Sequence, residues 1–234
     1  MDNNTLCRNL QDLLSLATPP VAVTFLAQPP AHLPRVSEPG LAGCSYWQRA
    51  AAGASFFTTA EDHMGCVVGA FTHAVALPEA KARELDEQLA MMVDLRYLER
   101  ESIGQIPHRL EPFAFASYAP LAEADGTPDA VLLQGNARAM MLLAEAALAA
   151  GLAHEGATMG RPTCSILPET VRTGRAVPSF GCAGNRIYTG LPDGELWYGL
   201  PGPGLESIVS QLAVIAHANR ELDRFHAARV AAAQ

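Results

Sequence analysis

The chain opens with apolar residues at helical spacing, followed by a short continuous apolar run. The helical pattern lies within residues 3–17 and predicts an amphipathic helix. Its apolar positions are Leu6, Leu10, Leu13 and Leu14. Prolines at 19 and 20 end this pattern, and Val21 to Leu26 then predicts a buried strand. A proline-rich loop over residues 28–42 follows.

The same reasoning predicts elements along the rest of the chain. A Glu-, Leu-, Met- and Ala-rich stretch indicates a helix, short apolar runs indicate strands, and Gly151 suits the residue that follows a helix C-terminus. The expected helices are 79–103, 136–150, 205–219 and a further stretch to the C-terminus, and the expected strands are 113–118, 129–133 and 195–200.

Helices and strands without a regular βαβ rhythm predict an α+β fold, with mixed α/β as the alternative. We expect one domain over residues 1–234. Within it, the order of a cysteine pair, a strand and a helix occurs twice. This order predicts two pseudo-repeated halves, 18–151 and 152–220, with residues 76–118 inserted in the first half. A chance match between short apolar elements is the other explanation.

Four cysteines lie in two look-alike segments that match these halves. Cys44 and Cys66 belong to the first half, and Cys164 and Cys182 to the second. Because each copy contributes two thiols, a local two-fold axis would bring all four together. Convergent thiolates suit a soft metal or an iron–sulfur cluster.

The cysteine spacing excludes the common sequence signatures of metal sites. No Cys-x-x-Cys, zinc-finger histidine pair or ferredoxin-type cysteine run is present. Cys44 and Cys164 are expected in the first turns of helices, where the dipole favours a thiolate. Cys66 and Cys182 lie between glycines, which let backbone N–H groups approach a bound group. Metal ligation, simple packing and a catalytic thiol all remain open.

Two further groups carry candidate chemistry. Asp62 and His63 precede Cys66 and are candidates for proton transfer, with a solvent-facing histidine as the alternative. Arginines cluster around the second cysteine segment, where Arg161 and Arg186 are candidates for binding an anionic substrate and Arg172 and Arg175 accompany them. Surface solvation is the alternative for all four. The aromatic residues near the cysteines suit either a pocket wall or the core: Tyr46, Trp47, Trp197 and Tyr198.

Composition narrows the class of protein. The net charge is −8, with 16 Lys and Arg against 24 Asp and Glu, so we expect no nucleic-acid partner. No run of about 18 apolar residues is present, which argues against a membrane span. The polar N-terminus does not resemble a secretory signal, so we expect a cytoplasmic protein whose five cysteines stay reduced.

Three motifs carry a family resemblance. They are Cys44-Ser45-Tyr46-Trp47, Asp62-His63-x-Gly65-Cys66-x-x-Gly69, and Ser179-x-Gly181-Cys182-x-Gly184-Asn185-Arg186 with the Asp193 to Pro201 stretch. In these motifs the chain resembles domain of unknown function 169, the ArCR family, from about Leu10 to about Ala216. Family members often have Asp-Gly-Ser-Arg after the second Gly-Cys, where this chain has Ala183-Gly184-Asn185-Arg186. The family's occurrence in anaerobes implies an oxygen-sensitive iron–sulfur centre.

The residues and the resemblance together predict a [4Fe–4S] cluster held by the four cysteines, with redox or Lewis-acid chemistry on a small anionic molecule or with a redox partner protein. Asp62 or His63 would handle protons, and Arg161 and Arg186 would bind the anion. A metal-free enzyme with a cysteine nucleophile and His63 as its base is one alternative. A non-enzymatic accessory protein, with structural zinc, is the other. The oligomeric state, including a homo-oligomer, stays open.

Overall fold

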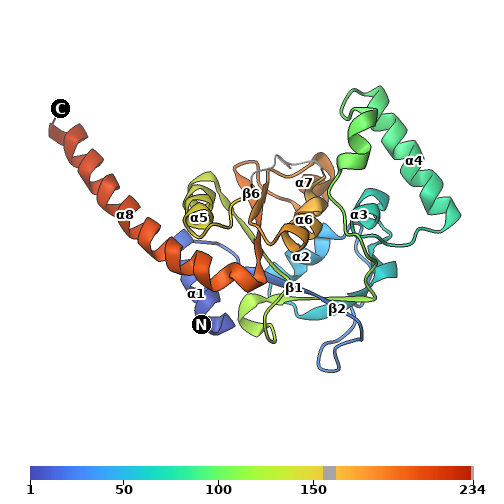
Figure 1. Cartoon of the computed structure of the whole chain (residues 1–234), viewed down its shortest axis with the longest axis horizontal. Coiled ribbons are helices and arrows are strands. Elements are labelled where there is room, and N and C mark those ends of the chain that lie inside the picture. The colour runs from blue at the N-terminus through green and yellow to red at the C-terminus, as the bar shows by residue number, and fades with distance from the viewer. Residues whose placement is uncertain (155–161, 233–234) are drawn as a thin grey trace.

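The computed structural model describes residues 1–154 and 162–232, which form an α+β fold around one six-stranded antiparallel sheet (Figure 1). The α-helices are α1 (Asn3–Leu14), α2 (Cys44–Ala51), α3 (Val67–Thr72), α4 (Glu79–Asp94), α5 (Ala137–Ala149), α6 (Ile166–Thr173), α7 (Ala183–Thr189) and α8 (Leu205–Ala232). The strands are β1 (Val21–Leu26), β2 (Phe56–Thr59), β3 (Phe115–Pro120), β4 (Ala130–Asn136), β5 (Val177–Ser179) and β6 (Glu195–Pro201). Short 3₁₀ helices are η1 (Ala60–His63), η2 (Arg100–Gln105), η3 (Leu121–Glu123), η4 (Thr163–Ser165) and η5 (Gly202–Gly204).

The sheet has the strand order β2-β3-β1-β4-β6-β5, so β1 and β4 form its centre and the short strands β2 and β5 its edges. The central pair is joined through Ala22 opposite Val131. On one side Val21 lies opposite Pro120, and on the other side Ala130 lies opposite Pro201. Each of these prolines ends its strand and leads into a 3₁₀ turn, η3 or η5.

Side chains alternate between the two faces of the sheet, as the two-residue period of a strand requires. In β4, Val131 and Leu133 enter the core beneath α1, α5 and α8, whereas Ala130 and Leu132 enter the core on the opposite face. We call the first group of helices the apolar layer. The second face is covered by α2, α3, α6 and α7, which we call the thiol layer because each of its helices begins at or just after one of the four paired cysteines.

Most of the predicted elements are confirmed. Strand β1 has its predicted bounds, α1 and α5 begin where their patterns begin, and Gly151 adopts φ +72° just past α5. The predicted C-terminal helix and its extension form one continuous helix, α8, whose last turns project from the body of the molecule (Figure 1). The stretch 79–103 is shorter as an α-helix, because α4 ends at Asp94 and the chain turns before η2.

The predicted order within each half differs from the observed one. A short edge strand, β2 or β5, separates the two cysteines of each half, and the strand and helix do not simply follow the pair. These strands have only four and three residues, too few for a period-two pattern to stand out from the neighbouring loops. Strand β4 and helix α5, expected to close the first half, lie next to β6 and α8.

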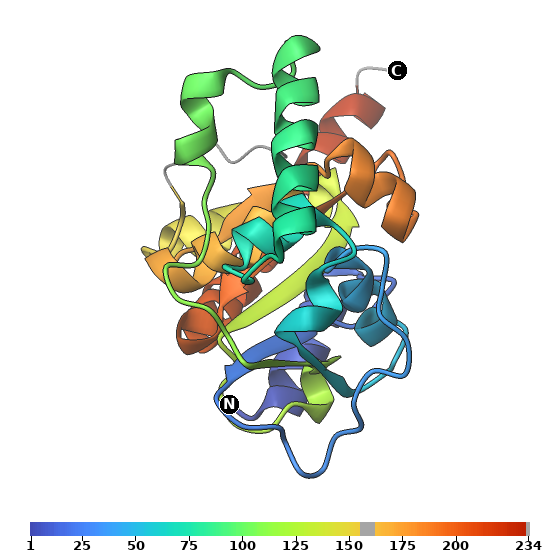
Figure 2. The same ribbon diagram turned by 90° about the vertical axis from the view of Figure 1, so that its right-hand side faces the viewer.

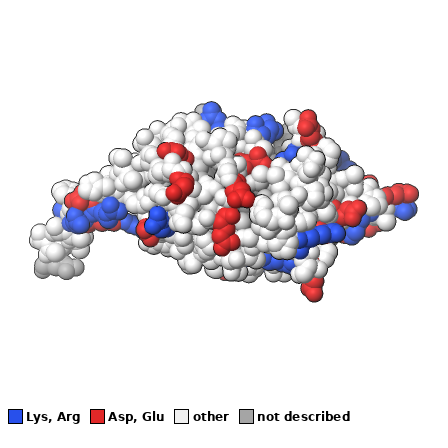
Figure 3. Space-filling model, turned by 90° about the horizontal axis from the view of Figure 1, so that it is seen from below, with Lys and Arg blue, Asp and Glu red and all other residues white. Residues whose placement is uncertain are grey.

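Charged side chains form small separate groups on the face shown in Figure 3, most of which is covered by other residues. Within the described part of the chain, no helix is long and apolar enough to cross a membrane.

Candidate functional site

The four paired cysteines line one cavity of about 530 Å³ at the outer side of the thiol layer. Cys44 and Cys66 approach it from the first half of the chain, and Cys164 and Cys182 from the second. Helix α2 packs against α7, and α3 packs against η4. Each cysteine-bearing helix start from one half therefore lies next to one from the other half, and the fold brings together thiols that are about a hundred residues or more apart in sequence.

Each of these thiols lies at the beginning of a helix. Cys44 is the first residue of α2, and Cys164 lies in the 3₁₀ turn that leads into α6. Cys66 and Cys182 are the N-cap residues of α3 and α7, and the Cys182 sulfur accepts a hydrogen bond from the Asn185 backbone N–H at 3.4 Å. Free N–H groups and the positive end of the helix dipole favour negative charge at such positions. The arrangement therefore favours thiolates once their charge is balanced.

Without such a balancing charge, the cavity favours neutral thiols. Burial raises the pKa of Cys44 to about 12, raises the pKa of Cys164 well above its usual value, and raises that of Cys66. The neighbouring thiols raise these pKa values further, because a negative charge on one sulfur opposes a second charge nearby. A bound cation would reverse this preference and release protons as it binds.

Asn185 is the polar side chain that the cavity leaves without a partner. It is 2% exposed, it lines the cavity, and its amide nitrogen and oxygen have no hydrogen-bond partner among the described residues. The amide lies beside the Cys44 sulfur and lowers the pKa of that thiol, although burial is the larger cause and raises it. A buried amide without partners costs about 1–3 kcal/mol, and a hydrogen-bonding group in the cavity beside Cys44 would offset that cost.

The wall also leaves room close to the sulfurs. A Cβ atom on Gly69 would lie 3.7 Å from the Cys66 sulfur and 3.9 Å from the Cys164 sulfur. Among residues 1–154 and 162–232, no group of three or more His, Cys, Asp and Glu side chains is close enough to hold a single metal ion.

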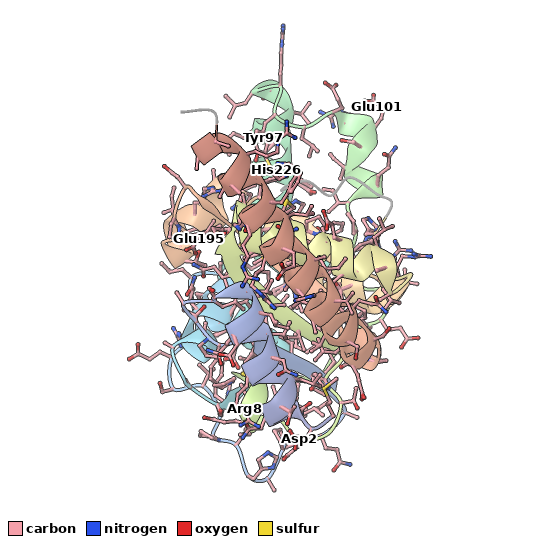
Figure 4. The ribbon with its side chains drawn as sticks, turned by 90° about the vertical axis from the view of Figure 1, so that its left-hand side faces the viewer. Asp2, Arg8, Tyr97, Glu101, Glu195 and His226 are labelled. Atoms are coloured by element: carbon pink, nitrogen blue, oxygen red, sulfur yellow. The ribbon has the colours of Figure 1, made fainter. Side chains whose placement is uncertain are left out.

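The far wall of the cavity is a long excursion of the chain, residues 76–114, which carries α4 and η2. In Figure 2 α4 stands upright above the sheet and η2 descends beside it. Figure 4 labels Tyr97 and Glu101 at this end of the molecule, opposite Asp2 and Arg8 near α1. Apolar side chains of the excursion face the thiols across the cavity: Leu89, Met92, Leu95, Leu98 and Ile106.

Asp62 and His63 lie beneath the thiol layer and do not line the cavity. The Asp62 carboxylate accepts hydrogen bonds from the Thr59 N–H and hydroxyl and from Arg35, and these contacts account for η1. Burial would raise the pKa of Asp62, but those hydrogen bonds and the Arg35 charge lower it below its usual value. The carboxylate is therefore held as a structural anion, and its proposed part in proton transfer stays a prediction.

His63 is buried, so the solvent-facing alternative is wrong. Its Nε2 lies 3.0 Å from the Thr58 hydroxyl, which in turn donates to the Ala116 carbonyl. This network assigns the proton to Nε2 and leaves Nδ1 as an acceptor directed at Gly43, where a Cβ would lie 2.9 Å away. Burial and the neighbouring His73 lower the pKa of His63 to about 3. The ring thus supports the backbone just before Cys44.

The arginines are placed differently from one another. Arg161 lies outside the described residues. The Arg186 guanidinium donates to backbone carbonyls of its own loop, among them Phe180 and Pro192, and lies outside the cavity wall. Arg172 pairs with Glu169, and Arg175 donates to the Ala153 carbonyl. Substrate binding by Arg161 and Arg186 stays a prediction.

The aromatic residues near the cysteines belong to the core. Tyr46, Trp47, Trp197 and Tyr198 are all buried and none lines the cavity. Trp47 and Trp197 meet edge to face at 5.3 Å between ring centroids, which joins α2 of one half to β6 of the other. They fix the relative positions of the helix starts that carry the thiols.

Sequence reasoning missed Asn185 as a cavity residue and the whole wall formed by α4 and η2. The sequence signal for Asn185 was its spacing from Cys182. A side chain three positions after the N-cap residue lies on the same side of the helix, close to the N-cap side chain. No comparable signal existed for the wall, since its apolar residues lie on a helix with a weak apolar stripe and few buried positions.

Comparisons with known proteins locate the chain in a family. A search of curated proteins and a search of solved structures each return no significant match. The profile of the family DUF169, described as uncharacterised ArCR, matches residues 9–211. That span includes the sheet, all four cavity thiols, Asn185 and the excursion over residues 76–114. The chain belongs to the DUF169 family.

Proposed function

We propose that this protein binds an iron–sulfur cluster of the [4Fe–4S] type through Cys44, Cys66, Cys164 and Cys182. The observation that carries the proposal is the convergence of four free thiols on one cavity, each at a helix start. Thiolates are the usual ligands of such clusters. Asn185 adds a buried amide that would donate to a ligand sulfur or to the cluster itself.

The cluster would supply redox or Lewis-acid chemistry, and the chain's own residues would bind, orient and shield the reacting molecule. The excursion over residues 76–114 covers the cavity and would exclude water. Asp62, His63 and Arg186 have no direct part in this proposed chemistry, because their polar groups support η1, α2 and the α7 loop. A reducing compartment such as the cytoplasm would keep the thiols available, and a redox partner protein is one source of electrons.

We further propose that the two halves arose by duplication. Several observations support this: β1 corresponds to β4, β3 to β6 and β2 to β5 by their places in the strand order. The pairing of Val21 with Pro120 repeats as Ala130 with Pro201, and the pairing of Phe56 with Tyr118 repeats as Val177 with Gly199. The second copy would then begin before β4, and α2 and α3 would correspond to α6 and α7.

Anaerobic purification or reconstitution with iron and sulfide tests the cluster. We expect about four irons and four acid-labile sulfides per chain, and a visible absorbance that bleaches on reduction. The iron content should increase with pH. Burial raises the pKa of Cys44, Cys66 and Cys164, so protons compete with the metal for these sulfurs at low pH. A colourless protein without iron after reconstitution would refute the proposal. Stoichiometric zinc would instead support a non-enzymatic accessory protein with a structural zinc ion.

Single Cys→Ser variants of the four cavity cysteines should each lower the iron content. Cys7 is the matched control, because it is a fifth buried thiol that lies in the apolar layer on the opposite face of the sheet. Cys7→Ser should leave the iron-to-protein ratio unchanged. Equal loss of iron in Cys7→Ser would mean that the effect comes from folding and not from ligation.

A metal-free enzyme with Cys182 as its nucleophile is the second candidate. Cys182 is partly exposed, and its sulfur receives the Asn185 N–H at the start of α7. Under this reading iodoacetamide should modify Cys182 much faster than the other thiols in metal-free protein, and Cys182→Ser alone should abolish activity. Similar alkylation of all four thiols would count against it.

A further inference from the structure

We propose that the cavity accepts a small molecule with an aliphatic body and a single anionic end, whose anion pairs with Arg96. This inference deepens the proposed function, since it names the class of molecule that would lie beside the thiols. It rests on the aliphatic cavity wall and on the position of Arg96 beside it, and neither depends on the metal.

The wall opposite the sulfurs is aliphatic. Leu89, Met92 and Leu95 come from α4 and its end, and Leu98 and Ile106 from the segment that returns through η2. A cavity of about 530 Å³ lies within the range of small-molecule sites, which are mostly apolar with a few polar groups that fix orientation. A molecule without an apolar body would leave this wall in contact with water or with poorly matched polar groups.

Arg96 is the one charged side chain among the described residues that line the cavity. Arg96 is an exposed residue at the end of α4, so its side chain has access to solvent beside the cavity. The net charge of the chain is −8 and gives no long-range attraction for an anion, so the preference for an anion over a cation at this place comes from the guanidinium of Arg96 alone. The guanidinium would pair with a carboxylate through two N–H groups, which also orients the bound molecule.

The chain adopts the left-handed conformation at Arg96, where α4 ends. The φ of Arg96 is +56°. The N–H of Tyr97 bonds to the carbonyl of Met92 just after α4, which is the hydrogen bond of a Schellman helix end. Glycine usually fills this position, and another residue costs about 1 kcal/mol. Ser15 and Ala74 adopt the same conformation, with φ +52° and +56°, so this helix end fixes the position of Arg96 and does not by itself assign a role to its side chain.

Calorimetric titration with octanoate and with 1-octanol tests both parts of the inference. Octanoate has the proposed body and anion, and octanol has the body alone. We expect both to bind, and octanoate to bind about two- to fivefold more tightly at low salt, which is the range of an exposed ion pair. Binding of neither probe would overturn the inference, and equal affinity for both would overturn the part assigned to Arg96.

Three variants locate the binding. Arg96→Gln should reduce the octanoate affinity to that of octanol and leave octanol unaffected. Met92→Glu should abolish the binding of both probes, because it places a charge on the aliphatic wall. Met91→Glu is the matched control, because Met91 is 52% exposed and does not line the cavity. The Met91→Glu variant should bind both probes normally. Loss of binding in Met91→Glu as well would overturn the assignment to this cavity.

The titration is run on metal-free protein and on protein reconstituted with iron and sulfide. Octanoate binding to protein that takes up no iron would refute the cluster and keep this inference. Iron uptake without octanoate binding would do the reverse. The two proposals therefore fail independently.

Discussion

The two layers that cover the sheet differ in how well their buried polar groups are satisfied. The apolar layer of α1, α5 and α8 packs through leucine and alanine, and its one cysteine, Cys7, bonds to Gln11 within its own helix. The thiol layer buries polar and charged residues within segments 58–73 and 163–185. Among the described residues, every buried side-chain atom without a hydrogen-bond partner comes from the thiol layer or the strand face beneath it: His63, Tyr118, Ser165, Thr170, Asn185 and Trp197.

This contrast indicates a division of labour within one small fold. Unpaired buried polar groups lower stability, so a layer that keeps several of them depends on its neighbour for folding free energy. The apolar layer supplies that free energy through close packing. The thiol layer holds four sulfurs and an amide in positions that packing alone would not favour.

The largest expected effect follows from breaking the apolar layer. Leu143 is fully buried there, and Leu143→Ala should lower the free energy of unfolding by about 2–5 kcal/mol. Urea denaturation measures the change. The iron bound per folded chain should stay at the level of the unsubstituted protein, because Leu143 lies on the face of the sheet away from the thiols. Selective loss of iron from the folded variant would contradict this division of labour between the two layers.

Acid should destabilise the protein through the thiol layer. Burial lowers the pKa of His63 to about 3 and that of His73 to about 4, so both stay neutral in the folded state. The unfolded chain takes up their protons below about pH 6.5. Their contribution to stability is therefore complete above that pH and is lost as pH falls, by about 1.4 kcal/mol per pH unit for each histidine.

Urea denaturation between pH 7 and pH 4.5 measures this slope. His63→Gln should make the slope shallower by about one proton, because one buried neutral group is removed. His226→Gln is the control, since His226 lies exposed on the projecting part of α8 (Figure 4). An unchanged slope in His63→Gln would show that acid acts elsewhere.

Asn185 gives a smaller effect of opposite sign. Asn185→Leu removes two unpartnered buried polar atoms at similar volume, so metal-free protein should gain about 1 kcal/mol of stability. The same change should weaken iron loading, because the amide beside Cys44 is lost. A gain in stability without any loss of loading would leave Asn185 outside the cluster site.

The smallest pair of effects compares two residues in the left-handed region, one at the end of α1 in the apolar layer and one in the excursion over residues 76–114. Ser15 follows α1 with φ +52°, and Arg96 follows α4 with φ +56°. Ser15→Gly and Arg96→Gly should each raise the free energy of unfolding by up to about 1 kcal/mol. Octanoate affinity should fall only in Arg96→Gly. A fall in both variants would mean that the effect is global.

Sequence patterns predicted the helices and strands whose composition or apolar spacing extends over many residues. Helix α5 has a strong helical composition and strand β1 a continuous apolar run, and both are found at or within a residue of their predicted bounds. Strands β2 and β5 and helices α3 and α7 were missed, because three to seven residues do not establish a period. The convergence of the thiols could be suspected from the duplicated cysteine motifs. The surroundings of Asp62 and His63 could not, because contacts with Arg35, Thr58 and Gly43 depend on tertiary structure.

The excursion over residues 76–114 leaves and rejoins the thiol layer through a narrow neck. At that neck the Arg109 N–H bonds to the Thr72 carbonyl, and the Arg109 guanidinium lies 3.9 Å from the centroid of the Phe25 ring. Under the proposed duplication the matching connection lies between α7 and β6, and in the described chain it is only a short turn. Insertions or substitutions within the excursion can therefore change the shape of the cavity while the sheet and the four cysteine sulfurs stay in place. Relatives with different lengths in this segment would be able to admit different guests to the same four thiols.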